Sequence, residues 1–219
     1  DQHRLDMGLG VADEEIAALR EQHGIRDTFN FIYIGRVSGE KSLNVAVEAF
    51  RQVHLKHKHA RFVIVGDGSA DRELDRLIPQ SGIESAVVRL GRVTHDRLIA
   101  DNIPRLGDVF ITASKTENQP VSLLEAMAFG LPIIGPRSRG IPELVEHGVN
   151  GYLFRPDAAD RMAGLMNSLV EDRALMDSMR KGAAEKVRPH AISNVAERLE
   201  TIYRKAIDTA DASGRTAAK

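Results

Sequence analysis

The chain has 219 residues, of which 42% are hydrophobic and 28% are charged, an ordinary composition for a soluble globular protein with a packed core. Its formal net charge of −1 argues against a dedicated nucleic-acid-binding protein, which normally carries a strongly basic balance. Cysteine is absent, which excludes disulfides and thiolate chemistry and is compatible with the cytoplasmic location that we expect.

Membrane and export signals are also missing from the sequence. No stretch approaches the roughly 20 apolar residues that span a bilayer. Residues 1–10 lack the basic and apolar regions of a signal peptide. The sequence begins with Asp rather than Met, which is compatible with a piece cut from a longer chain.

Short apolar runs alternate with amphipathic stretches as far as Phe154. The runs that predict strands are Phe29–Ile34, Arg61–Val65, Ala86–Leu90, Asp108–Thr112 and Pro132–Gly135, with a short piece at Tyr152–Phe154. The stretches that predict helices are residues 13–23, 42–57, 70–81, 94–101, 120–129 and 140–147. Because the strand runs are continuously apolar, they indicate a parallel sheet covered by helices on both faces. The pattern therefore predicts an α/β, Rossmann-like fold.

The pattern changes after Phe154 to successive helices with no strand between them. These helices are predicted at residues 157–170, 173–187 and 193–209, with Asp157 and Asp172 as caps of the first two. We therefore expect a linker and helix at residues 1–28, a Rossmann-like core at 29–155, a helical extension at 156–209 and a frayed tail at 210–219.

The loop after the first strand carries two cations. In an open parallel sheet, ligands bind beyond the carboxyl ends of the strands, so the loops there are the first place to look. The segment GRVSGEKS places Arg36 and Lys41 five residues apart across a glycine-bearing turn, where both could reach a pyrophosphate. The residue types alone favour the alternative, two solvated surface cations.

Glycines follow the second and third strands. Gly66 and Gly68 have the spacing of a dinucleotide fingerprint, but Asp71 stands where its third glycine would be. We therefore expect a tight turn from strand to helix rather than a dinucleotide site. Gly91, after the third strand, could likewise belong to a turn or to a ligand site.

The segment TASKTENQPVSLLEAMAFGLPIIG follows the fourth strand and is the most informative. Pro120 suits the first turn of a helix, and the N–H groups of Val121 and Ser122 at that helix start would bind an anion. Glu117 lies just outside this end and Glu125 about one turn inside it. Carboxylates accept hydrogen bonds from vicinal hydroxyls, so the pair could hold sugars on either side of a phosphate. Spacing alone does not decide between this and the alternative, carboxylates that complement the helix dipole.

Three histidines occur in the basic segment HLKHKH. His54 and His57 could share a helix face and bind a metal. No Asp, Glu or Cys completes the set nearby in the sequence, so an exposed basic helix end is the favoured interpretation.

Taken together, these motifs resemble the C-terminal domain of the large retaining glycosyltransferase family that includes sucrose synthases and phosphatidylinositol mannosyltransferases. The resemblance covers most of the chain, from about Leu19 to Ile207. It rests on GR followed by Lys41, FVIVGDG, LGRV, DVFITAS, ENQPVSLLEAMAFGLPIIG, GIPELVEHGVNGYLF and AERLETIYRKAI. The central piece is the most specific, with two glutamates separated by seven residues and followed by AMA-x-G-x-P.

The resemblance implies a two-domain GT-B enzyme whose C-terminal half binds a nucleotide-diphosphate sugar. Arg36, Lys41 and Glu117 would be the catalytic residues: the cations would stabilise the departing diphosphate, and Glu117 would bind the donor sugar. Glu125 would bind the ribose, and the loops around residues 89–92 would flank the base. The full set implied to bind donor and nucleotide is Gly35, Arg36, Lys41, Gly91, Arg92, Glu117, Asn118, Gln119, Pro120, Val121, Ser122 and Glu125.

The resemblance also implies which partners the enzyme has and lacks. Such enzymes need no metal or other cofactor for the leaving group, and we expect UDP as the nucleotide. Peripheral membrane association of the full enzyme would be compatible with the family. Two details depart from the family pattern. Asn118-Gln119-Pro120 replaces the variant in which a glycine amide faces the phosphate, and Ser42 stands where glycine is common.

The largest departure from the family is that these 219 residues do not include an N-terminal, acceptor-binding domain. Nothing before Phe29 could supply it, so we expect the 219-residue chain alone not to transfer sugar, and a measured transfer rate would contradict this. The last helix would then expose its apolar side, formed by Val195, Leu199, Ile202 and Tyr203, or pair it with another chain.

Two other functions stay open. A non-catalytic partner or regulatory module with the same fold is one, although retention of both cations and both glutamates speaks against it. An unrelated Rossmann-like protein, such as a dehydrogenase or nucleotide hydrolase, is the other. The lack of a full glycine fingerprint and of a P-loop counts against that alternative.

Overall fold

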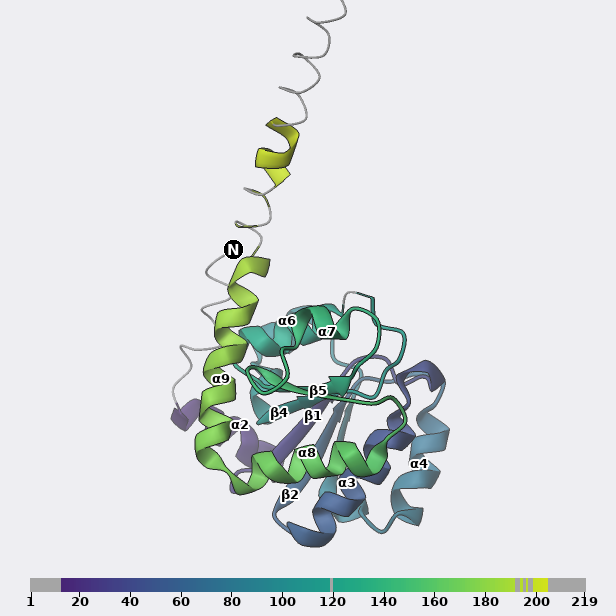
Figure 1. Cartoon of the computed structure of the whole chain (residues 1–219). Coiled ribbons are helices and arrows are strands. Elements are labelled where there is room, and N and C mark those ends of the chain that lie inside the picture. Colours follow the sequence, from purple (N-terminus) through teal and green to yellow (C-terminus); the bar gives the residue numbers. More distant parts are fainter. Residues whose placement is uncertain (1–12, 119, 192–193, 195, 197–198, 205–219) are drawn as a thin grey trace, which may run out of the picture.

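Six parallel strands form one sheet in the order β3-β2-β1-β4-β5-β6 (Figure 1). In this computed structural model, residues 13–118, 120–191, 194, 196 and 199–204 are described. The strands are β1 Phe29–Ile34, β2 Ala60–Val65, β3 Val87–Gly91, β4 Val109–Ile111, β5 Ile133–Pro136 and β6 Gly151–Phe154. Every pair of neighbours is parallel. The predicted α/β, Rossmann-like fold is confirmed, with strand boundaries within one residue of those expected.

Helices connect the strands, as parallel pairing requires. They are α2 Asp13–Gln22, α3 Leu43–Lys56, α4 Asp71–Gln80, α5 His95–Ala100, α6 Val121–Ala128, α7 Ile141–Leu144, α8 Ala159–Glu171 and α9 Arg173–Val187. Short 3₁₀ turns, which the sequence did not predict, lie at η1 Gly39–Lys41, η2 Glu84–Ala86, η3 Ile103–Leu106 and η4 Arg188–His190.

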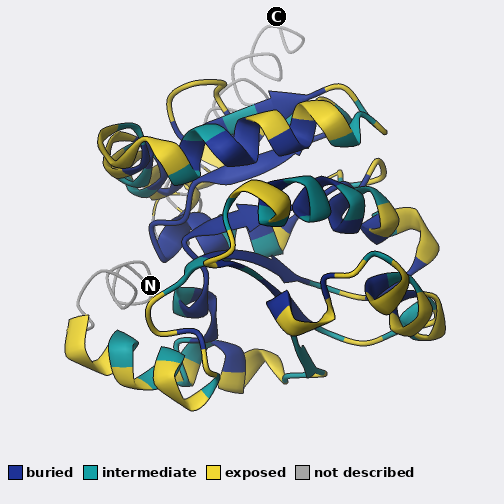
Figure 2. Cartoon of the chain, turned by 90° about the horizontal axis from the view of Figure 1, so that it is seen from below, coloured by how far each residue is buried: buried dark blue, intermediate teal, exposed yellow. Residues whose placement is uncertain are grey.

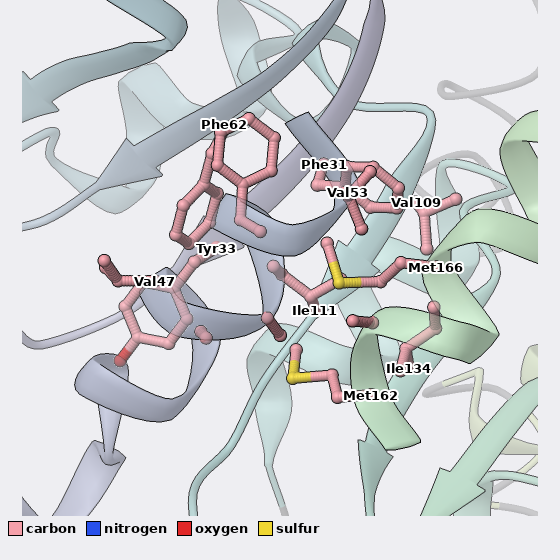
Figure 3. Packing of buried hydrophobic residues seen from close by; sticks show 14 of the residues in the cluster. Phe31, Tyr33, Val47, Val53, Phe62, Val109, Ile111, Ile134, Met162 and Met166 are labelled. Carbon is pink, nitrogen blue, oxygen red and sulfur yellow. The ribbon is translucent and has the colours of Figure 1, made fainter. Parts of the chain in front are cut away.

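Two apolar cores lie on opposite faces of the sheet because successive strand residues point to opposite sides. On one face, Phe31 and Tyr33 of β1 pack against α3, α4 and α8. On the other face, Ile32 and Ile34 pack against α5, α6 and α7. Figure 3 shows the first core, where aromatic rings from β1 and β2 meet methionines from α8. In Figure 2 the buried strands lie between helices whose outer faces are exposed.

Helix α9 contributes to both cores and lies along one edge of the molecule (Figure 1). Its first half buries Met176 and Met179 in one core, and its second half buries Ala183 and Val187 in the other. Asp172 caps it as predicted, since its Oδ1 accepts a hydrogen bond of 2.9 Å from the N–H of Leu175.

Two local predictions were wrong. The helix expected at residues 140–147 ends at Leu144, because the buried Asn150 side chain accepts from the N–H of Glu146 at 2.7 Å and donates to the Leu144 carbonyl at 2.9 Å. Asp157 is not a helix cap: it has a left-handed φ of 61°, and both its carboxylate oxygens lie 3.0 Å from Lys115 Nζ.

Residues 199–204 are helical, and their apolar side chains are exposed, as expected for Leu199, Ile202 and Tyr203. Val195 and the tail expected at 210–219 lie outside the described residues. None of the helices in the described part of the chain has the length and apolar character that crossing a membrane requires.

The sheet order fixes where a ligand site can form. Strands β1 and β4 are neighbours, but α3, which follows β1, and α6, which follows β4, pack on opposite faces. The two loops therefore separate beyond the carboxyl ends of these strands and leave a crevice, the usual ligand position in such sheets.

Candidate functional site

Two adjoining pockets occupy this crevice. The larger, of about 490 Å³, is lined by Ile34, Gly35, Arg36, Val65, Gly66, Asp67, Gly68, Arg92, Val93, His95, Leu98 and Glu125. The smaller, of about 200 Å³, is lined by Tyr33, Ile34, Gly35, Arg36, Lys41, Phe110, Thr112, Glu117, Pro120, Val121, Ser122 and Leu123. Residues 34–36 line both, so the end of β1 joins the two pockets.

The floor of the larger pocket depends on glycines at the end of β2. A Cβ added to Gly66 would lie 1.9 Å from the Gly35 carbonyl oxygen, and one added to Gly68 would lie 2.1 Å from that of Val37. Only glycine lets the two loops approach this closely. Asp71 accepts a hydrogen bond of 2.7 Å from the N–H of Gly68 and so fixes the turn. The predicted tight turn is confirmed, but it also lines a pocket, which the sequence did not indicate.

The start of α6 forms one wall of the smaller pocket. Pro120 is the N-cap residue, one position before the helix, and its carbonyl accepts from the N–H groups of Leu123 and Leu124 at 3.1 and 3.4 Å. The N–H groups of Val121 and Ser122 begin the helix, where no carbonyl of the helix can accept from them. This wall thus presents two donors and the positive end of the helix dipole to the pocket.

Lys41 and Glu117 meet in the same pocket. Lys41 Nζ donates to Glu117 Oε1, and the two side chains are only 16% and 21% exposed. The backbone holds both in place: Lys41 closes the η1 turn, and the Glu117 carbonyl accepts from the N–H of Gly140 at 2.9 Å. Ser42 has a left-handed φ of 49°, a conformation that favours glycine.

Arg36 reaches the pockets from the solvent side. Its side chain is 70% exposed, and its guanidinium donates to Glu40 Oε1 at 3.1 Å. The hydrogen bond from the Ser38 hydroxyl, 2.7 Å long, holds the pKa of the Glu40 carboxyl below its usual range. Arg36 and Lys41 therefore line the same pocket, but each is paired with a different glutamate.

Glu125 lies in the larger pocket, apart from Glu117 in the smaller one. Its Oε1 lies 2.6 Å from His95 Nε2, at the start of α5. The sequence did not indicate His95, because the two residues are 30 positions apart and no local motif connects them.

Tyr33 was also missed, since its strand position predicts only a core residue. Its hydroxyl donates to the Arg36 carbonyl at 2.8 Å and so supports the turn between the pockets. Burial, and next the nearby Glu117 carboxylate, raises the pKa of the Tyr33 phenol well above its usual value. The phenol is therefore a neutral hydrogen-bond donor at any pH at which the protein would act.

Some predicted site residues lie elsewhere. Gly91 and Asn118 line neither of these two pockets, while Arg92 lines the larger one. Arg89, at the start of the segment 89–92 whose loops were expected to flank the base, instead pairs with Asp71 and Asp75 of α4. Gln119 lies outside the described residues.

The histidines of HLKHKH lie at the other end of the sheet, around the start of β2. The helix end is less exposed than predicted: the His54 ring packs 5.9 Å from the Phe50 ring, and burial lowers the pKa of His54. His57 Nε2 lies 3.2 Å from Glu171 Oε1. Within the described ranges, no group of three or more His, Cys, Asp or Glu side chains could hold a metal ion.

The arrangement suits one kind of ligand. A lysine and two helix N–H groups face the smaller pocket and can bind a phosphate. The two carboxylates, one in each pocket, can accept from hydroxyl groups on either side of that phosphate.

Comparison with known proteins gives the family. A family model described as "Glycosyl transferases group 1" matches residues 15–186. The alpha-monoglucosyldiacylglycerol synthase of Acholeplasma laidlawii is 31% identical over 196 residues, which cover 89% of this chain and 48% of that protein. The alpha-D-kanosaminyltransferase of Streptomyces kanamyceticus is 28% identical, covering 86% of this chain and 49% of that protein. The chain thus spans about half the length of these curated relatives.

Solved structures share the fold. Anabaena Alr3699/HepE in complex with UDP-glucose superposes with a TM-score of 0.76 at 26% identity, covering 87% of this chain and 54% of that chain. The C-terminal domain of a group 1 family protein (LpcC) from Francisella tularensis has a TM-score of 0.68 at 22% identity, covering 77% of this chain and 90% of that domain.

Proposed function

The chain belongs to the group 1 glycosyl transferases, and on that premise we propose that its two joined pockets bind the nucleotide-diphosphate sugar of a retaining glycosyl transfer. The observation that carries the proposal is the order of groups along the crevice. The Glu125 carboxylate lines one pocket, Arg36 lies at the junction, and Lys41 with the α6 start and Glu117 lines the other. A ribose, a diphosphate and a sugar follow one another in the same order along the donor.

In this proposal the cations carry the chemistry. Charge builds up on the diphosphate as the sugar leaves, and Lys41, Arg36 and the N–H groups of Val121 and Ser122 stabilise it. No metal is needed for that step. Glu117, held by Lys41, orients the sugar hydroxyls, and Glu125 accepts from the ribose. Arg92, in the larger pocket, flanks the base.

UDP is the proposed nucleotide. The solved Anabaena relative is described in complex with UDP-glucose, which supports this choice at 26% identity. The coverage of the curated relatives supports an acceptor-binding part outside these 219 residues. That the chain alone does not transfer sugar, that the enzyme is cytoplasmic and that it can associate peripherally with a membrane stay predictions.

Calorimetric titration of the chain tests the proposal. UDP, GDP, ADP and their sugar conjugates are added in turn, with NAD as the control dinucleotide. We expect one nucleoside diphosphate, UDP, to bind more tightly than the others, and its affinity to fall in Glu125→Ala. Tight binding of NAD together with no response to any nucleoside diphosphate would refute the proposal.

A further inference from the structure

The contact between His95 and Glu125 joins two walls of the larger pocket. His95 is the first residue of α5, on the loop after β3, and Glu125 lies in α6, after β4. Their side chains meet at 2.6 Å, and both line the pocket. The His95 side chain is 60% exposed, whereas the Glu125 side chain is only 20% exposed. The histidine therefore stands at the rim, and the carboxylate that it contacts lies further inside.

The chemistry of the pair fixes the direction of the hydrogen bond. An ionised carboxylate only accepts, so His95 Nε2 carries the proton and donates to Glu125 Oε1. The carboxylate has about four acceptor positions, and this bond uses one of them. Glu125 can therefore contact His95 and still accept from two neighbouring hydroxyl groups.

Holding the carboxylate in one position before a ligand arrives favours binding. A free glutamate side chain has several rotamers, and fixing one of them when a ligand arrives costs conformational free energy. His95 selects one position of Glu125 in the pocket before any ligand binds. Its effect should then depend on whether the ligand has hydroxyl groups that Glu125 can accept from.

We propose that His95 is a positioning residue that holds Glu125 for the vicinal hydroxyls of a ribose, and so sets the preference for ribonucleotides over nucleotides without those hydroxyls. The proposal rests on the proposed function, because it takes the larger pocket as the nucleoside side of the donor site. It assigns His95 no contact with the reacting atoms.

The test compares two ligands that differ only in these hydroxyls, UDP and 2′,3′-dideoxyuridine diphosphate. The ratio of their dissociation constants is measured by calorimetry for the unmodified chain, His95→Ala, His95→Gln, Glu125→Ala and the double variant of His95→Ala with Glu125→Ala. His59→Ala is the control, since this exposed imidazole lies at the start of β2, at the opposite end of the sheet.

We expect the preference for UDP to fall about fivefold in His95→Ala, the size of one hydrogen bond of ordinary strength. His95→Gln, whose amide can donate from a similar position, should restore most of it, and His59→Ala should leave it unchanged. In the Glu125→Ala background, where no side chain at this position can accept from His95, His95→Ala should have no further effect on the ratio.

Two results would overturn the inference, and they differ in what else they reject. If UDP binds but His95→Ala weakens both ligands equally, His95 has a general structural role and only this inference fails. If the unmodified chain binds no nucleoside diphosphate, the proposed function fails together with it.

Discussion

Lys41→Met should weaken UDP binding by about 50-fold or more, the effect expected when one member of a partly buried charge pair is removed. Lys41 is the least exposed of the cations in the crevice, and it donates to Glu117 beside the N–H groups of the α6 start. Met keeps most of the side-chain volume but not the charge. The Glu117 carboxylate would then face the diphosphate with no cation between them, so repulsion adds to the lost attraction.

Lys115→Met is the matched control for this variant. Lys115 follows β4, as the segment with Glu117 does, but its side chain is 45% exposed and pairs with Asp157. We expect its UDP affinity to stay within about twofold of the unmodified chain, since Lys115 lines neither of the two pockets and its exposed ion pair contributes little to stability. Calorimetry measures both variants, and far-ultraviolet circular dichroism checks that each is folded. Equal loss in the two variants would mean that Lys41 acts only through the overall charge of this face.

A large loss of stability is expected for Asp108→Ala, at the other end of the sheet. The Asp108 side chain is 10% exposed and accepts from Arg20 at 3.0 Å, from Arg180 at 2.8 Å and from the backbone N–H of Asn30 at 2.8 Å. It thus connects α2 and α9 to the start of β1. Burial lowers the pKa of the nearby Arg105, and the charges of Arg180 and Arg20 lower it further. Asp108 is ion-paired with two of these three clustered guanidiniums, those of Arg20 and Arg180.

Removing this carboxylate should reduce the free energy of unfolding by about 3 kcal/mol, near the lower end of the range for breaking a buried ion pair. The lower end applies because the Arg180 side chain is 41% exposed and can be solvated again. Urea unfolding followed by circular dichroism measures the change. Glu21→Ala, on the same helix as Arg20, removes an exposed pair with Arg26 and should cost under about 0.5 kcal/mol. Similar losses in both variants would contradict the role of Asp108 in joining these elements.

The strands and most helices could be predicted because their signals are local. Continuous apolar runs gave all six strands within one residue, and the sheet order followed the usual pattern for alternating strands and helices. The exceptions have long-range causes. The helix after β5 is short because the Asn150 side chain, beyond its end, hydrogen-bonds to the N–H of Glu146 and the carbonyl of Leu144. Asp157 pairs with Lys115, 42 positions away, instead of capping a helix.

The candidate site could be predicted in part for the same reason. The α6 start and its two glutamates form a local motif, so their placement along the crevice agrees with the sequence. The pairing of Lys41 with Glu117 spans 76 positions, and that of His95 with Glu125 spans 30. No single segment contains such a pair. The close approach of Gly66 to Gly35 also depends on two loops meeting, so a two-glycine pattern predicted only a turn.

A crystal structure of the chain with UDP tests the proposed donor site most directly. We expect the β-phosphate within about 3 Å of Lys41 Nζ and of the N–H groups of Val121 and Ser122, and the ribose hydroxyls within hydrogen-bond distance of the Glu125 carboxylate. A UDP molecule bound outside these two pockets, or one whose phosphates face Glu125 while its ribose lies beside Lys41, would contradict the proposed site.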